Sequence, residues 1–244
     1  MSIDYLLNGD PQEKIRWQGH VTMYGRPVYG SRRSIAHLEY TNQRSLKKFN
    51  EEIGIIQSAY NSGVEASAGT HDFDATYDTY IAGVDWWSQQ RFFRECGWAA
   101  WYRYPPAFGR HIHMISLGYN TRVGIYVPGQ VNDYYRRALG LKGQHNTGAD
   151  TSWFPPDIDK TVFDYGAWKK KEQDDMANAD EVLKVLKDFR GDFNDFQKLM
   201  KAREERTLKW RKEFRAAIGR RFNATDAQLD EIEAEIDRKV EEEK

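Results

Sequence analysis

Before Trp168, short runs of apolar and polar positions divide the chain into alternating strands and helices. Apolar side chains at every second position predict strands, and apolar positions three or four apart predict amphipathic helices. The predicted strands cover 53–60, 75–81, 98–104 and 112–117. The predicted helices cover 41–54, 85–94 and 131–139, and we expect 61–72 and 140–168 to be irregular. Interleaved strands and helices without a Rossmann glycine motif predict an α+β domain with a small, mainly antiparallel sheet and flanking helices.

The last part of the chain has a different pattern, with apolar residues in steps of three and four. The stripe consists of Leu186, Phe189, Phe193, Phe196 and Met200, and after polar Arg203 and Thr207 it recovers at Trp210, Phe214 and Ala217. This spacing predicts a long, coiled-coil-like helix of about 40 residues that begins near Asp180. A capping box over 225–228 then predicts a second helix, with Leu229, Ile232, Ile236 and Val240 on one face.

So charged a helix has little to bury alone, because its apolar stripe is narrow. One interpretation is a helical hairpin in which the two helices pack on each other. The other, which we favour, is that residues 180–244 self-associate or dock onto a different protein.

Charge divides the chain at the same place. Residues 169–244 contain 19 Lys+Arg and 20 Asp+Glu, about half of the segment, and they contain no His, Pro or Cys. The remaining residues hold all six histidines and all seven prolines. Compact domains need turn-forming residues, whereas long solvated helices need charge and no proline. We therefore expect a compact domain over 1–168 and a charged helical segment over 169–244.

Several classes of protein are disfavoured by composition. The formal net charge of −1 argues against a nucleic-acid partner, because such binders usually carry a strongly basic surface. No run of 18 apolar residues predicts a membrane span, and the N-terminus does not resemble a signal peptide. The single cysteine, Cys96, excludes an internal disulfide framework, and we expect it to be buried or half-buried without a chemical role.

Two short motifs concentrate residues of the types that bind metals. In a strand, His111 and His113 face the same side, so one can bind a metal while the other acts beside it. Asp78 lies on the predicted strand that follows the loop containing His71. Two imidazoles, one carboxylate and an open position form a site of the catalytic zinc type. The alternative is a pair of satisfied or exposed histidines, because a lone HxH motif is weak.

The segments SAGTH (67–71), RECGWAAWYR (94–103) and HIHMISLG (111–118) resemble the zinc D-Ala-D-Ala carboxypeptidase-like (VanY-type) peptidases. These share a superfamily with lysostaphin and hedgehog domains, and the likeness is closest to versions from phages of actinobacteria. It covers roughly residues 30–150. The resemblance implies that His71, Asp78 and His113 bind Zn²⁺ and that His111 assists catalysis. It also implies a peptidoglycan peptide as substrate, and a protein made in the bacterial host cytoplasm that acts at the cell wall or resides in the virion.

The chain departs from this family at two places. Small residues usually separate the first His from the Asp, but here Phe73 and Asp74 intervene. Many relatives place a general-base Glu three residues before the last His, where this chain has Arg110. Two hypotheses follow. Either His111 acts as the base of a zinc peptidase, or the domain is a catalytically degenerate structural protein of a phage particle that docks through its C-terminal helices.

Other residues are candidates for contact with substrate. We expect Arg103 to neutralise a peptide carboxylate or an oxyanion, and Tyr60 and Ser67 to bind substrate. The alternative for Arg103 and Tyr60 is a strand-edge arginine and a packed tyrosine. The other three histidines, His20, His37 and His145, are expected at the surface. Four tryptophans are expected in the core, with glycan binding as the alternative: Trp86, Trp87, Trp98 and Trp101.

Overall fold

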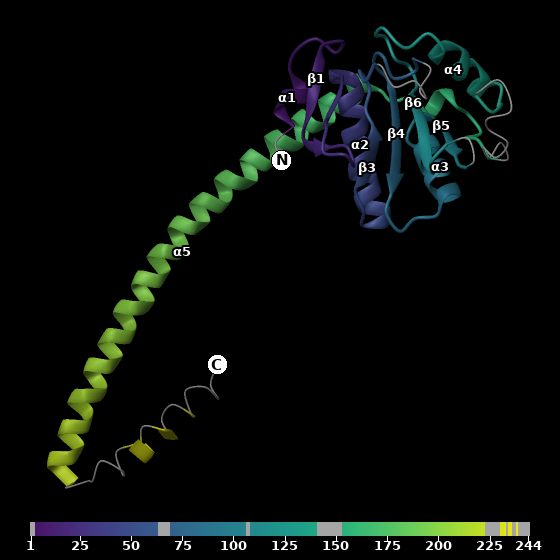
Figure 1. Cartoon of the computed structure of the whole chain (residues 1–244). Coiled ribbons are helices and arrows are strands. Elements are labelled where there is room, and N and C mark those ends of the chain that lie inside the picture. Colours follow the sequence, from purple (N-terminus) through teal and green to yellow (C-terminus); the bar gives the residue numbers. More distant parts are fainter. Residues whose placement is uncertain are drawn as a thin grey trace. The chain divides into compact units, whose positions relative to one another are not determined.

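A computed structural model describes residues 3–62, 69–105, 108–140 and 153–222, together with 230–232, 234–235 and 238. The chain divides into two units, Met1–Asp175 and Met176–Lys244. The first unit combines helices with antiparallel sheets, which confirms the predicted α+β class (Figure 1). None of the helices in the described part of the chain is long and apolar enough to cross a membrane.

The central sheet has four strands in the order β3-β4-β6-β5, and each neighbouring pair is antiparallel. The strands are β3 (Ile53–Gln57), β4 (Thr76–Ile81), β5 (Trp98–Arg103) and β6 (His111–Ser116). All four were predicted to within a few residues. The strands β4 and β5 are buried along nearly their whole length, because helices and loops cover both faces of the sheet.

A second, two-stranded sheet lies near the N-terminus and was not predicted. After α1 (Asp4–Leu7), strands β1 (Lys14–Val21) and β2 (Pro27–Ser31) pair as an antiparallel hairpin. A parallel bridge between Thr22 and Ile55 connects this hairpin to the edge strand β3. The hairpin thereby covers part of the exposed edge of the central sheet.

Helices α2 (Arg32–Phe49) and α3 (Trp86–Glu95) pack on one face of the sheet. The predicted start of α2 near Thr41 was wrong, because the Ser31 hydroxyl caps the helix by accepting the Ser34 N–H. Asn42 is not a cap but accepts a hydrogen bond from the N–H of Ile53 at 2.9 Å. The prediction of α3 is confirmed, with Asp85 as its N-cap.

The expectation that His37 lies at the surface was also wrong, because it is fully buried on α2. Its ring stacks on Trp98 with centroids 3.8 Å apart, and its two nitrogens contact the Ser116 hydroxyl and the Cys96 carbonyl. Cys96 is buried as expected, and burial raises the pKa of its thiol to about 12. His37 and Cys96 therefore have structural roles between α2 and the sheet.

On the opposite face, helix α4 (Val127–Tyr135) and the segment after residue 153 cover the sheet. The core there consists of Ala75, Ala99, Trp101, Ile115, Leu117, Val127, Tyr134, Phe154 and Ile158. The helix predicted over 131–139 thus begins earlier, with Pro128 in its first turn, a position that proline tolerates well. Of the four tryptophans expected in the core, Trp98 and Trp101 are buried and Trp87 is exposed.

The long C-terminal helix α5 runs from Tyr165 to Phe222, after the short 3-10 turn η2 (Asp159–Thr161). Its predicted start near Asp180 was wrong, because Asp164 caps an earlier first turn by accepting the N–H of Ala167. The expected boundary between the segments 1–168 and 169–244 falls at the end of the first turn of α5. The capping box over 225–228 lies outside the described residues. So do the side chains of seven residues of the predicted stripe: Leu186, Phe189, Phe193, Phe196, Trp210, Phe214 and Ala217.

Candidate metal centre

One face of the central sheet carries a row of side chains that runs across all four strands. Directly opposed residues of an antiparallel pair share a face. Asp78 on β4 is opposite His113 on β6, and His113 is in turn opposite Trp101 on β5. On the other side of β4, Gln57 at the end of β3 is the partner of Asp78. The register therefore brings Asp78 and His113 together, although they are far apart in the sequence.

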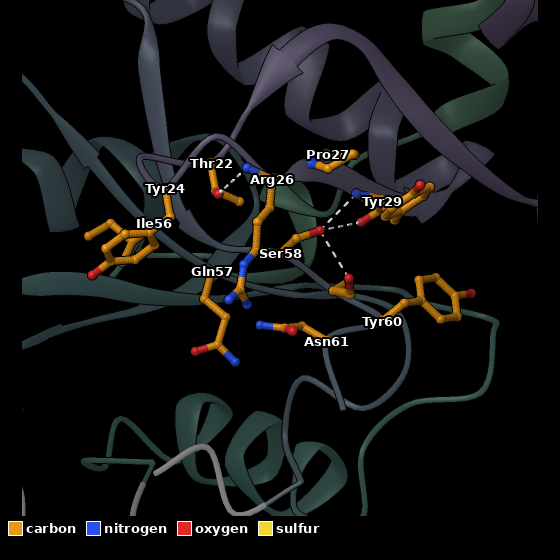
Figure 2. A pocket seen from close by; sticks show the side chains of 11 residues that line it. Thr22, Tyr24, Arg26, Pro27, Tyr29, Ile56, Gln57, Ser58, Tyr60 and Asn61 are labelled. Atoms are coloured by element: carbon orange, nitrogen blue, oxygen red, sulfur yellow. Dashed lines mark hydrogen bonds between the residues drawn. The ribbon is translucent and has the colours of Figure 1, made fainter. Parts of the chain in front are cut away.

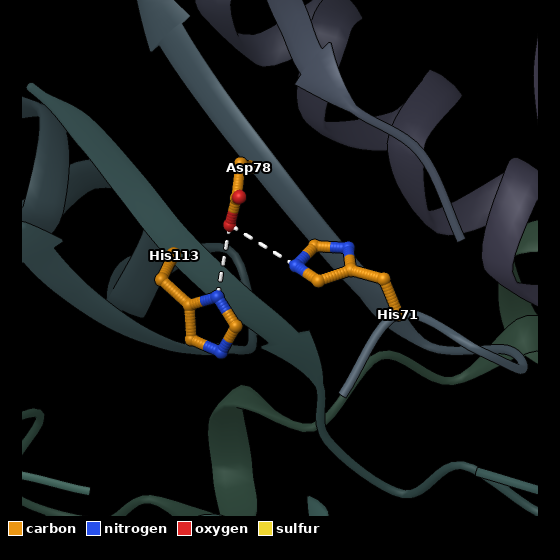
Figure 3. Close-up of side chains that lie close together, drawn as sticks. All are labelled: His71, Asp78 and His113. Atoms are coloured by element: carbon orange, nitrogen blue, oxygen red, sulfur yellow. Dashed lines mark hydrogen bonds and ion pairs between the residues drawn. The ribbon is translucent and has the colours of Figure 1, made fainter. Parts of the chain in front are cut away.

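His71 completes the cluster from the turn that precedes β4. Its Nε2 lies 3.3 Å from Asp78 Oδ1, and His113 Nδ1 lies 2.9 Å from the same oxygen. Figure 3 shows the two imidazole rings directed at the carboxylate from different elements. All three residues are buried, and one ligand atom from each lies within 4.8 Å of the others. The N–H of Asn61 donates to the His71 carbonyl at 2.8 Å and so helps to hold the turn.

The geometry of the three donors fits a metal ion. Ligand atoms about 2.0–2.2 Å from a tetrahedral zinc ion lie roughly 3.4 Å from one another. The two contacts of Asp78, at 2.9 and 3.3 Å, are close to that separation. Two imidazoles and one carboxylate leave a fourth position open, which is typical of catalytic rather than structural sites. His71, Asp78 and His113 can therefore hold a metal ion, as predicted from the sequence.

Electrostatics keep His113 and Asp78 in the protonation states that metals bind. Burial lowers the pKa of His113 to about 4, so its imidazole is neutral at physiological pH. Burial alone would raise the pKa of Asp78, but the neighbouring His71 and His111 and the hydrogen bonds from His113 and His71 hold it well below its ordinary value. A carboxylate and a neutral imidazole are the forms that coordinate metals.

His111 lies beside the three donors rather than among them. Its Nε2 is 3.7 Å from Asp78 Oδ1, and its Nδ1 is 2.7 Å from the Gly109 carbonyl. A carbonyl oxygen only accepts hydrogen bonds, so Nδ1 carries the proton in the neutral ring. The lone pair of Nε2 is then directed at the site. This orientation suits a general base, the role expected for His111.

Arg103 lies opposite His111 on β5, and its side chain is buried. The residue is 1% exposed, and neither Nη1 nor Nη2 has a partner in the described part of the chain. Burial lowers its pKa to about 9, against the opposing pull of Asp78, so Arg103 still carries its charge at pH 7. Although β5 is an edge strand of the sheet, Arg103 does not reach solvent. The buried unpaired charge instead favours a role in holding an anion.

Gln130 on α4 adds a polar group that the sequence did not indicate. Its Oε1 lies 3.4 Å from His113 Nε2, and its buried Nε2 has no acceptor among the described residues. Gln130 reaches His113 because α4 packs on the sheet, and no sequence motif identifies Gln130 as a site residue. Together, Gln130 and Arg103 give the surroundings of the metal centre several unused hydrogen-bond donors.

The remaining candidates lie at different places. Tyr60 is next to Asn61 and lines a pocket beside the metal centre, whereas Ser67 lies outside the described residues. Arg110 is exposed.

Asp74, one of the departures from the family pattern, is buried and accepts hydrogen bonds from Ser31 N–H and from two hydroxyl groups. Asp74 therefore serves the fold, and its carboxylate is not directed at the metal centre.

The chain was compared with protein-family models, with curated proteins and with solved structures, and nothing matched.

Proposed function

We propose that this protein is a zinc-dependent peptidase that cleaves the stem peptides of peptidoglycan. The observation that carries the proposal is the buried cluster of His71, Asp78 and His113, with donors of Arg103 and Gln130 beside it that have no partner among the described residues. A site that served only to stabilise the fold would be expected to satisfy its buried donors. The similarity of its sequence motifs to VanY-type peptidases supports the choice of metal and of substrate.

Each residue has a distinct chemical part in the proposed reaction. His71, Asp78 and His113 would hold a zinc ion, which would supply Lewis acidity to the site. His111 accepts the proton of the attacking water at Nε2, because Gly109 fixes its tautomer. Arg103 and Gln130 donate hydrogen bonds to the negative charge that develops on the carbonyl oxygen. His111 thus takes the role that a glutamate has in many relatives.

Hydrolysis of purified peptidoglycan by the full-length chain tests this proposal. We expect release of peptide fragments in the presence of Zn²⁺, loss of activity after treatment with a chelator, and recovery when Zn²⁺ is restored. His113→Ala should abolish hydrolysis, whereas Arg110→Ala should leave it intact, because Arg110 is exposed. Zinc binding without hydrolysis of any wall preparation would favour the alternative, a peptidase-like structural protein of a phage particle.

We further propose that the helical segment attaches the enzyme to a phage particle or to a second copy of itself. On α5, exposed apolar side chains recur beyond Asp175, at Val182, Leu183, Leu199, Met200 and Leu208. An isolated helix gains little from such residues unless a partner covers them. Light scattering should therefore show an oligomer for the full chain or for its mixture with virion proteins. A monomer under both conditions would contradict this role.

A further inference from the structure

A pocket of about 580 Å³ lies where the β1–β2 hairpin meets the end of β3. Its wall includes Tyr24, Arg26, Tyr29, Gln57, Tyr60 and Asn61. In Figure 2, the Arg26 side chain extends from the hairpin toward Gln57 and Asn61. The pocket thus combines aromatic rings, amide groups and one guanidinium, a combination suited to a polar ligand with a charged group.

Two connections place this pocket beside the metal centre. Gln57 is the register partner of Asp78, and neighbouring strands lie about 4.8 Å apart. The backbone N–H of Asn61 donates to the carbonyl of His71 at 2.8 Å. An extended peptide advances about 3.3 Å per residue. Because Gln57 and Asn61 are direct neighbours of Asp78 and His71, we expect a substrate residue close to the scissile bond to face the pocket.

The charges around the pocket are positive. Arg26 is exposed, and no acidic residue lines the pocket among the described residues. Lys14 adds a second cation, since its Nζ lies 4.9 Å from the ring centroid of Tyr29 and 4.6 Å from that of Tyr60. The nearby Asp74 is buried and already accepts hydrogen bonds from the protein.

We propose that this pocket binds a carboxylate of the substrate, located one or two residues from the cleaved bond, through Arg26. The inference rests on the proposed function and deepens it by naming what the enzyme recognises. A guanidinium matches a carboxylate with two parallel hydrogen bonds, and Lys14 adds favourable charge nearby. A stem peptide offers carboxylates from two sources, the chain terminus and the α-carboxylate of γ-linked D-Glu.

Calorimetric binding of synthetic peptides to the chelator-treated full-length protein tests the pocket without turnover. The probes are L-Ala-γ-D-Glu-L-Lys-D-Ala-D-Ala and two versions of it, one amidated at the C-terminus and one at the α-carboxylate of D-Glu. We expect one amidation to weaken binding about tenfold or more, as for loss of a charge-assisted hydrogen bond. The amidation that does so identifies the source of the carboxylate.

The variant Arg26→Gln should bind the unmodified peptide and the weakly bound amidated peptide with equal affinity. Arg136→Gln should keep the preference for the unmodified peptide. Arg136 is a matched control because it is also exposed but does not line the pocket. Equal binding of all peptides by the unmodified protein, no binding of any peptide, or a preference that survives Arg26→Gln would overturn the proposal. Zinc-restored hydrolysis is measured on the same preparations, so failure of the peptidase function is seen separately from failure of the pocket.

Discussion

Replacement of Arg103 by methionine should make the protein more stable and less active. Methionine keeps most of the length of the side chain but removes its charge. In the folded protein the guanidinium is buried and neither terminal nitrogen has a hydrogen-bond partner among the described residues. A group that costs stability in the free protein yet lies at the metal centre is expected to act on a ligand.

The size of the effect follows from the pKa of Arg103. Burial lowers that pKa from 12.5 to about 9, which corresponds to about 5 kcal/mol of unfavourable free energy on the charged form. This figure is an upper limit, because the variant also loses the contact between the guanidinium and the Trp101 ring at 5.5 Å. Replacement of buried charges by apolar residues has been neutral or stabilising by roughly 1–4 kcal/mol. We expect Arg103→Met to fall in that range.

Urea unfolding of Arg103→Met and of the matched variant Arg94→Met provides the assay. Arg94 is equally buried, but it donates to the Ala100 carbonyl at 2.9 Å and also to the Trp153 carbonyl, so its loss should destabilise the fold. In peptidoglycan hydrolysis, Arg103→Met should lose about 10²–10³-fold in kcat, as for removal of an oxyanion donor. If Arg103→Met destabilises the protein as Arg94→Met does, Arg103 is structural and the reasoning is wrong.

Two further predictions concern histidines on opposite faces of the sheet. His111→Gln should lower kcat about 10²-fold or more while the zinc content stays unchanged, because the proposed mechanism uses His111 as a base and not as a ligand. Loss of zinc in this variant would contradict that role. His37 is buried with a pKa well below 6.5, chiefly through desolvation, so the unfolded chain takes up a proton that the folded chain does not. Stability should therefore fall as the pH drops below about 6.5, by about 1.4 kcal/mol per pH unit from this residue. In urea unfolding at pH 7.5 and 5.5, His37→Gln should lose that part of the pH dependence, and an unchanged dependence would refute the assignment.

The strands and the metal donors could be predicted because their signals are local. Alternation along β4 and β6 marks the strands, and the two-residue spacing of His111 and His113 places both side chains on one face. The separation between His71 and Asp78 is short enough for a turn to bring them together. Register then positions Asp78 opposite His113, a pairing that the sequence suggests but does not specify.

The surroundings of the site depend on tertiary packing and were missed for that reason. Gln130 reaches His113 only because α4 packs on the sheet. The pocket with Arg26 depends on the β1–β2 hairpin, whose polar, Gly-containing strands lack a strong alternation. His37 was expected at the surface because no partner lies at ligand spacing in the sequence, yet α2 turns its ring onto Trp98. The starts of α2 and α5 were misplaced because Ser31 and Asp164 cap earlier turns.

The measurement that tests the central claim most directly is the zinc content of the purified full-length protein, before and after Asp78→Asn. Asp78 contacts both His71 and His113, so the loss of its charge removes one donor and weakens the arrangement of the others. We predict about one tightly bound zinc ion per chain and almost none in Asp78→Asn, with both proteins folded by circular dichroism. Folded protein without zinc even after incubation with excess Zn²⁺, or equal zinc in both proteins, would contradict it.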